Sequence, residues 1–284
     1  MNETYGFERT GPVFSKTVQG RRLSLTRLFT VEAIDPYMDV YQEIWGLTER
    51  ERIPAHEPTV AARVGGLFLG VELDWEKIGL VYVVPAHDPD KGFYHHSKIM
   101  GFKAKYQGLG LGVEAKRVHA ILAQEQGVKR VTWTFDPLMV RNASLNFRKL
   151  GGIARTYMEN AYGNYGGRYD FGLPSDRFLI EWELESERVK TRLRGEGPTA
   201  EALWQQWKDA PVYADPTAEL VAPAYRAEVP ANVFELAKTD AATAQKEQGQ
   251  FRDCLKRLLA AGYAVTEFLA EPKSGAGNYY LLAR

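Results

Sequence analysis

The sequence predicts an α/β fold with a mixed, mostly antiparallel central sheet flanked by helices, and with an additional C-terminal α/β region. Two observations lead to this prediction. Three strand-like segments, 66–73, 78–84 and 92–102, follow one another across short turns, as in an antiparallel meander. From Leu111 the apolar residues recur at intervals of four, three and four, which is typical of an amphipathic helix and ends the meander.

The other elements follow from periodicity and from turn residues. Residues 23–29 alternate apolar and polar side chains like a half-buried strand. Asp35-Pro36 then offers an N-cap and a first-turn proline for a helix that ends at Gly46. The helix from Leu111 ends at Gly127. The next predicted elements are a strand at 128–135, a short helix at 143–150 and two strands at 153–158 and 178–184.

Two segments suggest how the chain is divided. Residues 159–177 are rich in glycine and tyrosine and poor in aliphatic side chains, so they are expected to form a long loop. The charged stretch after Glu185 marks a boundary. We therefore expect a main domain at 1–185, a connecting segment at 186–223 and a C-terminal α/β region at 224–284, which supports the main domain.

Composition excludes several classes of function. Thirty-six Lys and Arg balance thirty-six Asp and Glu, so no net charge draws the protein to a nucleic acid or to an anionic membrane. Cys254 is the sole cysteine, which rules out an internal disulfide and a cysteine cluster for zinc. Neither a signal peptide nor a transmembrane stretch is evident. We expect a soluble, cytoplasmic protein, and a homo-oligomer remains open.

The most informative segment is KYQGLGLGVEA, residues 105–115, because it places three glycines between a strand and a helix. The first turn of a helix has unpaired N–H groups and the positive end of the helix dipole, so it attracts a phosphate that no side chain blocks. A tight turn without a ligand is the alternative. A second alternative is an NAD(P)-dependent oxidoreductase, because Gly110, Gly112 and Ala115 fit the GxGxxA fingerprint and Asp136 follows as a ribose-binding acid would.

The same loop resembles motif A of the GNAT acyltransferase superfamily, (Q/R)-x-x-G-x-(G/A), through Gln107, Gly110 and Gly112. RNASLNFRKLGG, residues 141–152, resembles its motif B, and the resemblance covers roughly residues 22–184. It implies a GNAT-type fold and acetyl-CoA or another acyl-CoA as cofactor and acyl donor. The residues expected to bind that cofactor are Phe102, Ala104, Gln107, Gly108, Leu109, Gly110, Leu111, Gly112, Asn142 and Phe147.

The resemblance implies N-acylation of a small-molecule amine, such as an amino acid, with an acetyl or related acyl group, succinyl included. Transfer requires a group that takes a proton from the amine, and His95 and His96 on the last meander strand are the candidates. Many family members protonate the thiolate with a motif B tyrosine, but the corresponding residue is Phe147. Either a tyrosine of the segment 157–169, with Tyr157 as the candidate, or water then supplies the proton. A protein that binds acyl-CoA without turnover is the alternative.

Acceptor binding is expected beyond the tyrosine-rich loop. Arg177 is a candidate to bind a substrate carboxylate with both nitrogens of its fork, Asp176 to attract the amine, and Tyr165 to line the site. A structural ion pair between Asp176 and Arg177 is the alternative. The sequence contains no ligand set with metal-binding spacing, so no metal is predicted.

Overall fold

A computed structural model describes residues 4–163, 171–271 and 277–284 of the chain. The chain divides into two compact units, each of which has its own core. The described part of unit 1 consists of residues 4–133 and 183–185. The described part of unit 2 consists of residues 134–163, 171–182, 186–271 and 277–284.

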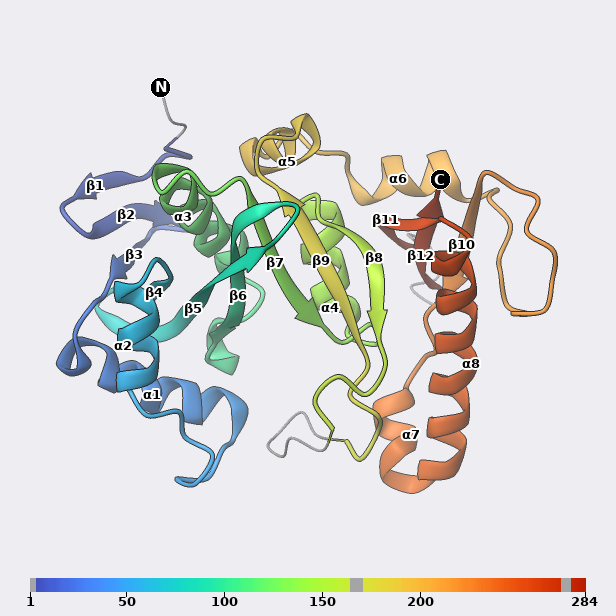
Figure 1. Cartoon of the computed structure of the whole chain (residues 1–284), viewed down its shortest axis with the longest axis horizontal. Coiled ribbons are helices and arrows are strands. Elements are labelled where there is room, and N and C mark those ends of the chain that lie inside the picture. Colours follow the sequence, from blue (N-terminus) through green and yellow to red (C-terminus); the bar gives the residue numbers. More distant parts are fainter. Residues whose placement is uncertain (1–3, 164–170, 272–276) are drawn as a thin grey trace. The chain divides into compact units, whose positions relative to one another are not determined.

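Unit 1 contains the predicted meander. Its strands lie in the order β1-β2-β3-β4-β5-β6-β7, and all neighbours are antiparallel except β6 and β7, which are parallel (Figure 1). The strands are β1 (Glu8–Thr10), β2 (Val13–Val18), β3 (Arg21–Arg27), β4 (Leu67–Leu73), β5 (Glu76–Asp88), β6 (Gly92–Phe102) and β7 (Arg130–Phe135), of which the first four β7 residues belong to this unit. The helices are α1 (Val31–Trp45), α2 (His56–Arg63), a 3₁₀ turn η1 (Ala104–Tyr106) and α3 (Leu111–Glu125).

Helices cover both faces of this sheet. One core joins the apolar residues of α3, such as Val118 and Leu122, to Leu25, Leu69 and Val81 of the strands. The other core joins α1 and α2 to the opposite face of β4, β5 and β6. The prediction of a mixed, mostly antiparallel sheet flanked by helices is therefore confirmed.

The start of α1 differs from the prediction. The helix begins at Val31, where the Thr30 hydroxyl caps it by accepting a hydrogen bond from the Ala33 N–H at 3.3 Å. Pro36 lies inside the helix, not at its first position. A single missing N–H is tolerated there because the apolar face of α1 is buried against the sheet. The predicted end at Gly46 is confirmed, since this residue is left-handed with φ 64°.

Unit 2 is a second α/β layer with strand order β9-β8-β11-β12-β10, in which all neighbours are antiparallel. Its strands are β8 (Ile153–Met158), β9 (Arg177–Glu183), β10 (Ala224–Glu228), β11 (Ala264–Ala270) and β12 (Asn278–Ala283). Its helices are α4 (Val140–Ala143), a π-helical turn η2 (Ser144–Lys149), α5 (Glu187–Arg194), α6 (Ala200–Trp207), α7 (Val233–Thr239) and α8 (Ala241–Ala260).

The division of the chain differs from the predicted one. Residues 134–163 and 171–182 belong with the C-terminal region because they share one aromatic core with it. Tyr280 of β12 packs against the rings of Phe147 and Phe178 at centroid distances of 5.7 and 5.2 Å. The predicted connecting segment, 186–223, is partly helical, and Arg192 of α5 is bound to the carboxylate of Glu267 on β11. Core formation between residues far apart in sequence leaves no local signal.

Candidate active site

The glycine loop has the geometry of an anion site. Gly108 and Gly110 have φ angles of +88° and +80°, and nothing lies within 4 Å of a Cβ placed on either residue. Gly110 is the N-cap of α3, and no side chain caps that end of the helix. Leu111 is buried and fixes the first turn to the core of unit 1. The N–H groups of that turn are therefore accessible to a ligand oxygen.

Strands β6 and β7 separate next to this loop. They are paired at only two positions, His95 with Val131 and His96 with Thr132. Strand β6 continues to Phe102 and stays paired with β5 on its other edge. Its residues 97–102 thus present one edge without a β7 partner. Such an edge binds an extended, amide-containing chain as an additional strand.

Two of the predicted cofactor contacts flank that edge. The side chain of Gln107 turns back and donates a hydrogen bond from Nε2 to the Phe102 carbonyl at 3.3 Å. Ala104 starts the 3₁₀ turn that leads from β6 to the loop, and it is exposed. Leu109 packs partly on the core. The loop is thus anchored on both sides while its glycines stay open.

The two histidines of β6 have different environments. His95 is fully buried, with Nδ1 3.2 Å from His119 Nε2 and Nε2 3.0 Å from the Gly65 carbonyl oxygen. His96 is only partly buried, and its Nδ1 lies 2.9 Å from Thr132 Oγ1. Its Nε2 makes no hydrogen bond to any described residue. Of the two, His96 is the one that can receive a proton from a ligand.

Electrostatics keeps His96 neutral. Burial lowers its pKa below the usual value, and the positive charges of Lys116 and Lys98 lower it further. Lys116 itself is fully buried on α3, where its Nζ lies 3.7 Å from the centroid of the Trp133 ring, and burial lowers its pKa to about 7. The sequence pattern gave no reason to single out Lys116, because a lysine in an amphipathic helix is usually exposed.

The two motif B residues occupy different environments in unit 2. Asn142 lies exposed on the short helix α4. Phe147 is fully buried, and its ring packs edge-on against Phe135, Phe178 and Tyr280. A side chain without exposed surface cannot touch a ligand. Phe147 is therefore a core residue, and it does not belong among the cofactor contacts.

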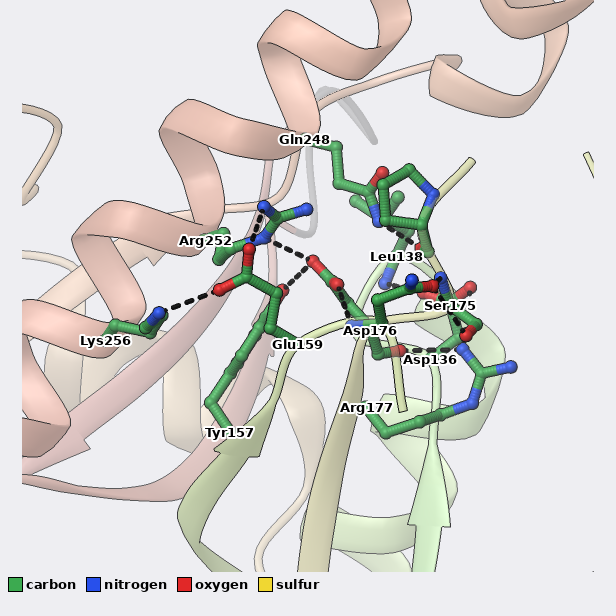
Figure 2. Close-up of polar contacts among 12 residues, drawn as sticks. Asp136, Leu138, Tyr157, Glu159, Ser175, Asp176, Arg177, Gln248, Arg252 and Lys256 are labelled. Atoms are coloured by element: carbon green, nitrogen blue, oxygen red, sulfur yellow. Dashed lines mark hydrogen bonds and ion pairs between the residues drawn. The ribbon is translucent and has the colours of Figure 1, made fainter. Parts of the chain in front are cut away.

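Asp176 is the centre of a buried polar network (Figure 2). Its Oδ2 accepts hydrogen bonds from the Tyr157 hydroxyl at 2.7 Å and from Arg252 Nε at 2.8 Å, and its Oδ1 accepts one from the Asn160 N–H at 2.9 Å. Glu159 joins Arg252 and Lys256 on the outside of the network. Asp176 therefore ties the start of β9 to the loop after β8 and to α8, and both of its carboxylate oxygens are already hydrogen-bonded.

Tyr157 is committed to this network. Burial raises its pKa well above the usual value, and the neighbouring Asp176 carboxylate raises it further. A phenol with a raised pKa is a weaker acid, so it gives up its proton less readily to a thiolate. The structure thus argues against Tyr157 as the catalytic acid. Tyr165 lies outside the described residues.

Arg177 does not pair with the carboxylate of Asp176. Its Nη1 donates to the Asp176 backbone carbonyl at 2.7 Å and lies 3.6 Å from Oδ2 of Asp136, the residue that follows β7. Burial raises the pKa of Asp136 to about 6, although the charge of Arg177 acts in the opposite direction. The sequence had suggested Asp136 only as a ribose-binding acid. The strand before the glycine loop, β6, is parallel to β7 on one edge but antiparallel to β5 on the other, so it ends an antiparallel meander, whereas the dinucleotide prediction calls for a mostly parallel sheet.

Among residues 4–163, 171–271 and 277–284, no group of three or more His, Cys, Asp and Glu side chains is arranged to hold a metal ion. No helix in the same ranges combines the length and the apolar composition that a bilayer crossing requires.

No model of a known protein family matches the chain, and no curated protein matches it in sequence. Solved structures match part of its fold. Mycobacterium smegmatis RimJ in complex with CoA-disulfide is 14% identical, with 66% of this chain and 97% of that chain covered and a TM-score of 0.49. Ribosomal-protein-S5-alanine acetyltransferase from Vibrio fischeri is 13% identical, with 61% and 97% covered and a TM-score of 0.45. A GNAT family acetyltransferase from Elizabethkingia anophelis with acetyl-CoA bound is 15% identical, with 57% and 97% covered and a TM-score of 0.42. At these identities the similarity concerns the fold alone.

Proposed function

We propose that this chain is a GNAT-type N-acyltransferase that transfers an acyl group from acyl-CoA to the amine of a small molecule. One observation carries the proposal: an uncapped helix start with left-handed glycines directly follows a strand whose edge is open. The first feature suits a pyrophosphate and the second suits an amide-containing arm, and CoA joins these two chemical groups in one molecule.

In this proposal the pyrophosphate binds the N–H groups between Gly108 and Gly112. The pantetheine arm extends along residues 97–102 of β6 and forms hydrogen bonds with backbone groups near Phe102 and Ala104. The neutral overall charge of the chain fits this mode of binding, because backbone N–H groups hold the phosphates without a cluster of basic side chains.

His96 is the proposed general base. Its lowered pKa keeps the imidazole neutral at neutral pH. In the tautomer whose Nδ1–H donates to Thr132 Oγ1, Nε2 has a free lone pair and can take a proton from the ammonium form of the acceptor. The neutral amine then attacks the thioester carbonyl; the C–N bond forms, the C–S bond breaks and CoA leaves as a thiolate. A proton from water converts the thiolate to the thiol, since Tyr157 is held by Asp176. The nitrogen loses its second proton as the amide forms, and the hydroxide left from that water takes this proton, so water is restored.

The decisive experiment places a carboxylate at the proposed phosphate position. Gly110→Glu is expected to abolish CoA binding measured by calorimetry, because the new charge repels the pyrophosphate from the helix start. Gly127→Glu is the matched control: it lies just beyond the other end of α3, with φ +75° and nothing within 4 Å of its Cβ. The control carries the same charge and backbone strain and should bind CoA like the wild type. Equal CoA affinity in folded Gly110→Glu would contradict the proposal.

Binding without turnover is the second candidate function. Two observations favour it: Phe147 stands where many GNAT members have a tyrosine, and the hydroxyl of Tyr157 is already used. Thiol release from acetyl-CoA, followed with a thiol-reactive dye in the presence of a panel of amines, separates the two functions. Release that depends on an amine shows an enzyme. Tight binding of acetyl-CoA without release under all conditions shows a binding protein.

A further inference from the structure

Asp136 and Asp176 lie close to each other in unit 2, and their carboxylates differ in the number of hydrogen bonds that they accept. Asp176 accepts three hydrogen bonds, as described above. Asp136 accepts one, from the Leu138 N–H to Oδ1 at 2.8 Å. The nearest cationic group to its Oδ2 is Arg177 Nη1 at 3.6 Å, which is beyond hydrogen-bonding distance. No other described residue donates to Oδ2.

The side chain that carries this oxygen remains partly accessible. The side chain of Asp136 keeps 20% of its exposure, compared with 1% for Asp176. A carboxylate in such a position has lost most of its hydration without receiving a donor in exchange, which is costly for the folded protein. Burial without compensation is common at binding sites, where the ligand supplies the missing partner.

The surroundings of Asp136 define the charge of that ligand. Arg177 brings one positive charge next to one negative charge, so the pair as a whole is neutral. For a simple cation, the attraction to the carboxylate of Asp136 is offset by the repulsion from the guanidinium of Arg177. A molecule with an ammonium and a carboxylate close together gains from both side chains. The ring of Tyr162 lies 5.5 Å from the Arg177 guanidinium carbon, and its hydroxyl lies 2.7 Å from Thr134 Oγ1, which gives the pair an aromatic neighbour.

We propose that Asp136 and Arg177 bind the ammonium and the carboxylate of a free amino acid. The ammonium donates to Asp136 Oδ2, and the ligand carboxylate accepts from the guanidinium of Arg177. Both side chains belong to unit 2. The amine-binding role that the sequence suggested for Asp176 passes to Asp136, because the Asp176 side chain is only 1% exposed and already accepts three hydrogen bonds.

The pair predicts how binding depends on pH. The groups that face Asp136 are Arg177 on β9, the neighbouring Asp176, Tyr157 on β8 and Tyr280 on β12. Burial raises the pKa of Tyr157 and of Tyr280 well above the usual value, so neither hydroxyl titrates between pH 5 and 8. The pKa of Asp136, in contrast, is about 6. Below that value Asp136 is protonated and no longer attracts the ammonium. Affinity for the amino acid should therefore fall about tenfold per pH unit below pH 6.

The test measures binding rather than activity. The full chain is screened by thermal shift with each of the twenty standard L-amino acids, with and without saturating free CoA. The amino acid with the largest shift is titrated by calorimetry, together with its carboxamide and its N-acetyl derivative. We expect the amino acid to bind at least tenfold more tightly than either derivative. Asp136→Asn should weaken its binding at least tenfold and remove the pH dependence.

Glu159→Gln is the control variant, since it removes a carboxylate from the outer part of the network without touching Asp136 or Arg177. It should bind the amino acid like the wild type. No shift with any of the twenty, or equal binding by Asp136→Asn, would overturn the inference. If Asp136→Asn does not fold, the wild-type pH profile decides, because a constant affinity between pH 5 and 8 is equally contradictory. CoA binding at the glycine loop is measured separately, so an unoccupied pair with intact CoA binding leaves the proposed function standing.

Discussion

Replacing each of the two neighbouring aspartates by asparagine should change the stability of unit 2 in opposite directions. Asparagine at position 176 still accepts the Asn160 N–H with its remaining oxygen, but its amide group then faces Tyr157 and Arg252. The tyrosine hydroxyl can turn and accept, whereas a guanidinium can only donate. The loss of this buried, charged hydrogen bond costs about 3 kcal/mol, with the remaining bond from Arg252 to Glu159 limiting the damage.

Asparagine at position 136 should be neutral or stabilising. The pKa of Asp136 is about 6 in the folded protein, compared with the ordinary 3.8, so its charge disfavours folding at pH 7.5 by roughly 3 kcal/mol. Removal of the charge relieves that cost. The same linkage makes the wild type more stable as the pH falls from 7 to 4, because the folded state takes up this proton first. The stabilisation that comes from protonation of Asp136 is fully present below about pH 4 and is lost as the pH rises through about 6.

Thermal unfolding at pH 7.5, followed by circular dichroism, measures both variants against the wild type. Asp176→Asn should lower the melting temperature by about 6–12 °C at 2–4 °C per kcal/mol, and Asp136→Asn should not lower it. Equal destabilisation by the two substitutions would refute the reasoning. It would show that Asp136 and Arg177 form a structural ion pair, and the amino-acid site would lose its basis.

The remaining predictions concern the base and the α5 contacts. His96→Ala should lower turnover about 10²-fold with unchanged CoA affinity, and the wild-type rate should fall only below the ordinary histidine pKa, because the shift of His96 is downward; full activity of the variant from pH 6 to 9 would exclude this base. Glu267→Gln should destabilise the protein by about 3–5 kcal/mol in urea unfolding, since it removes the buried charge that Arg188 and Arg192 share. Glu187→Gln, whose carboxylate is exposed beside Lys190, should change stability by less than about 1 kcal/mol, and similar losses for both would contradict the difference.

The sequence predicted what local patterns determine. Apolar alternation located the meander, and the change of period at Leu111 located α3. The glycine loop was recognisable because left-handed conformations favour glycine, and Gly108 and Gly110 adopt them.

Contacts between distant residues were not predictable in the same way. Arg177 and Asp136 are 41 positions apart in the sequence. The residues next to them in the sequence do not indicate that the two side chains lie close together. The adjacency of Asp176 and Arg177 suggested an ion pair, but the Asp176 carboxylate accepts from Tyr157 and Arg252, whereas the Arg177 guanidinium lies near Asp136. Their side chains therefore bind different partners. The burial of Lys116 could not be predicted for a related reason: the helical period of the apolar residues does not show which charged side chain of α3 is buried.

The position of Tyr280 has a consequence for synthesis of the protein. This ring packs against Phe147 and Phe178, and its hydroxyl donates to the Pro137 carbonyl at 2.6 Å. At roughly 5–20 residues per second, a ribosome makes Tyr280 on the order of ten seconds after Phe147. During that interval the aromatic residues after β7 have no completed core, while most of unit 1 is already available to fold. Chaperone binding to the nascent chain should therefore concentrate on residues 134–182.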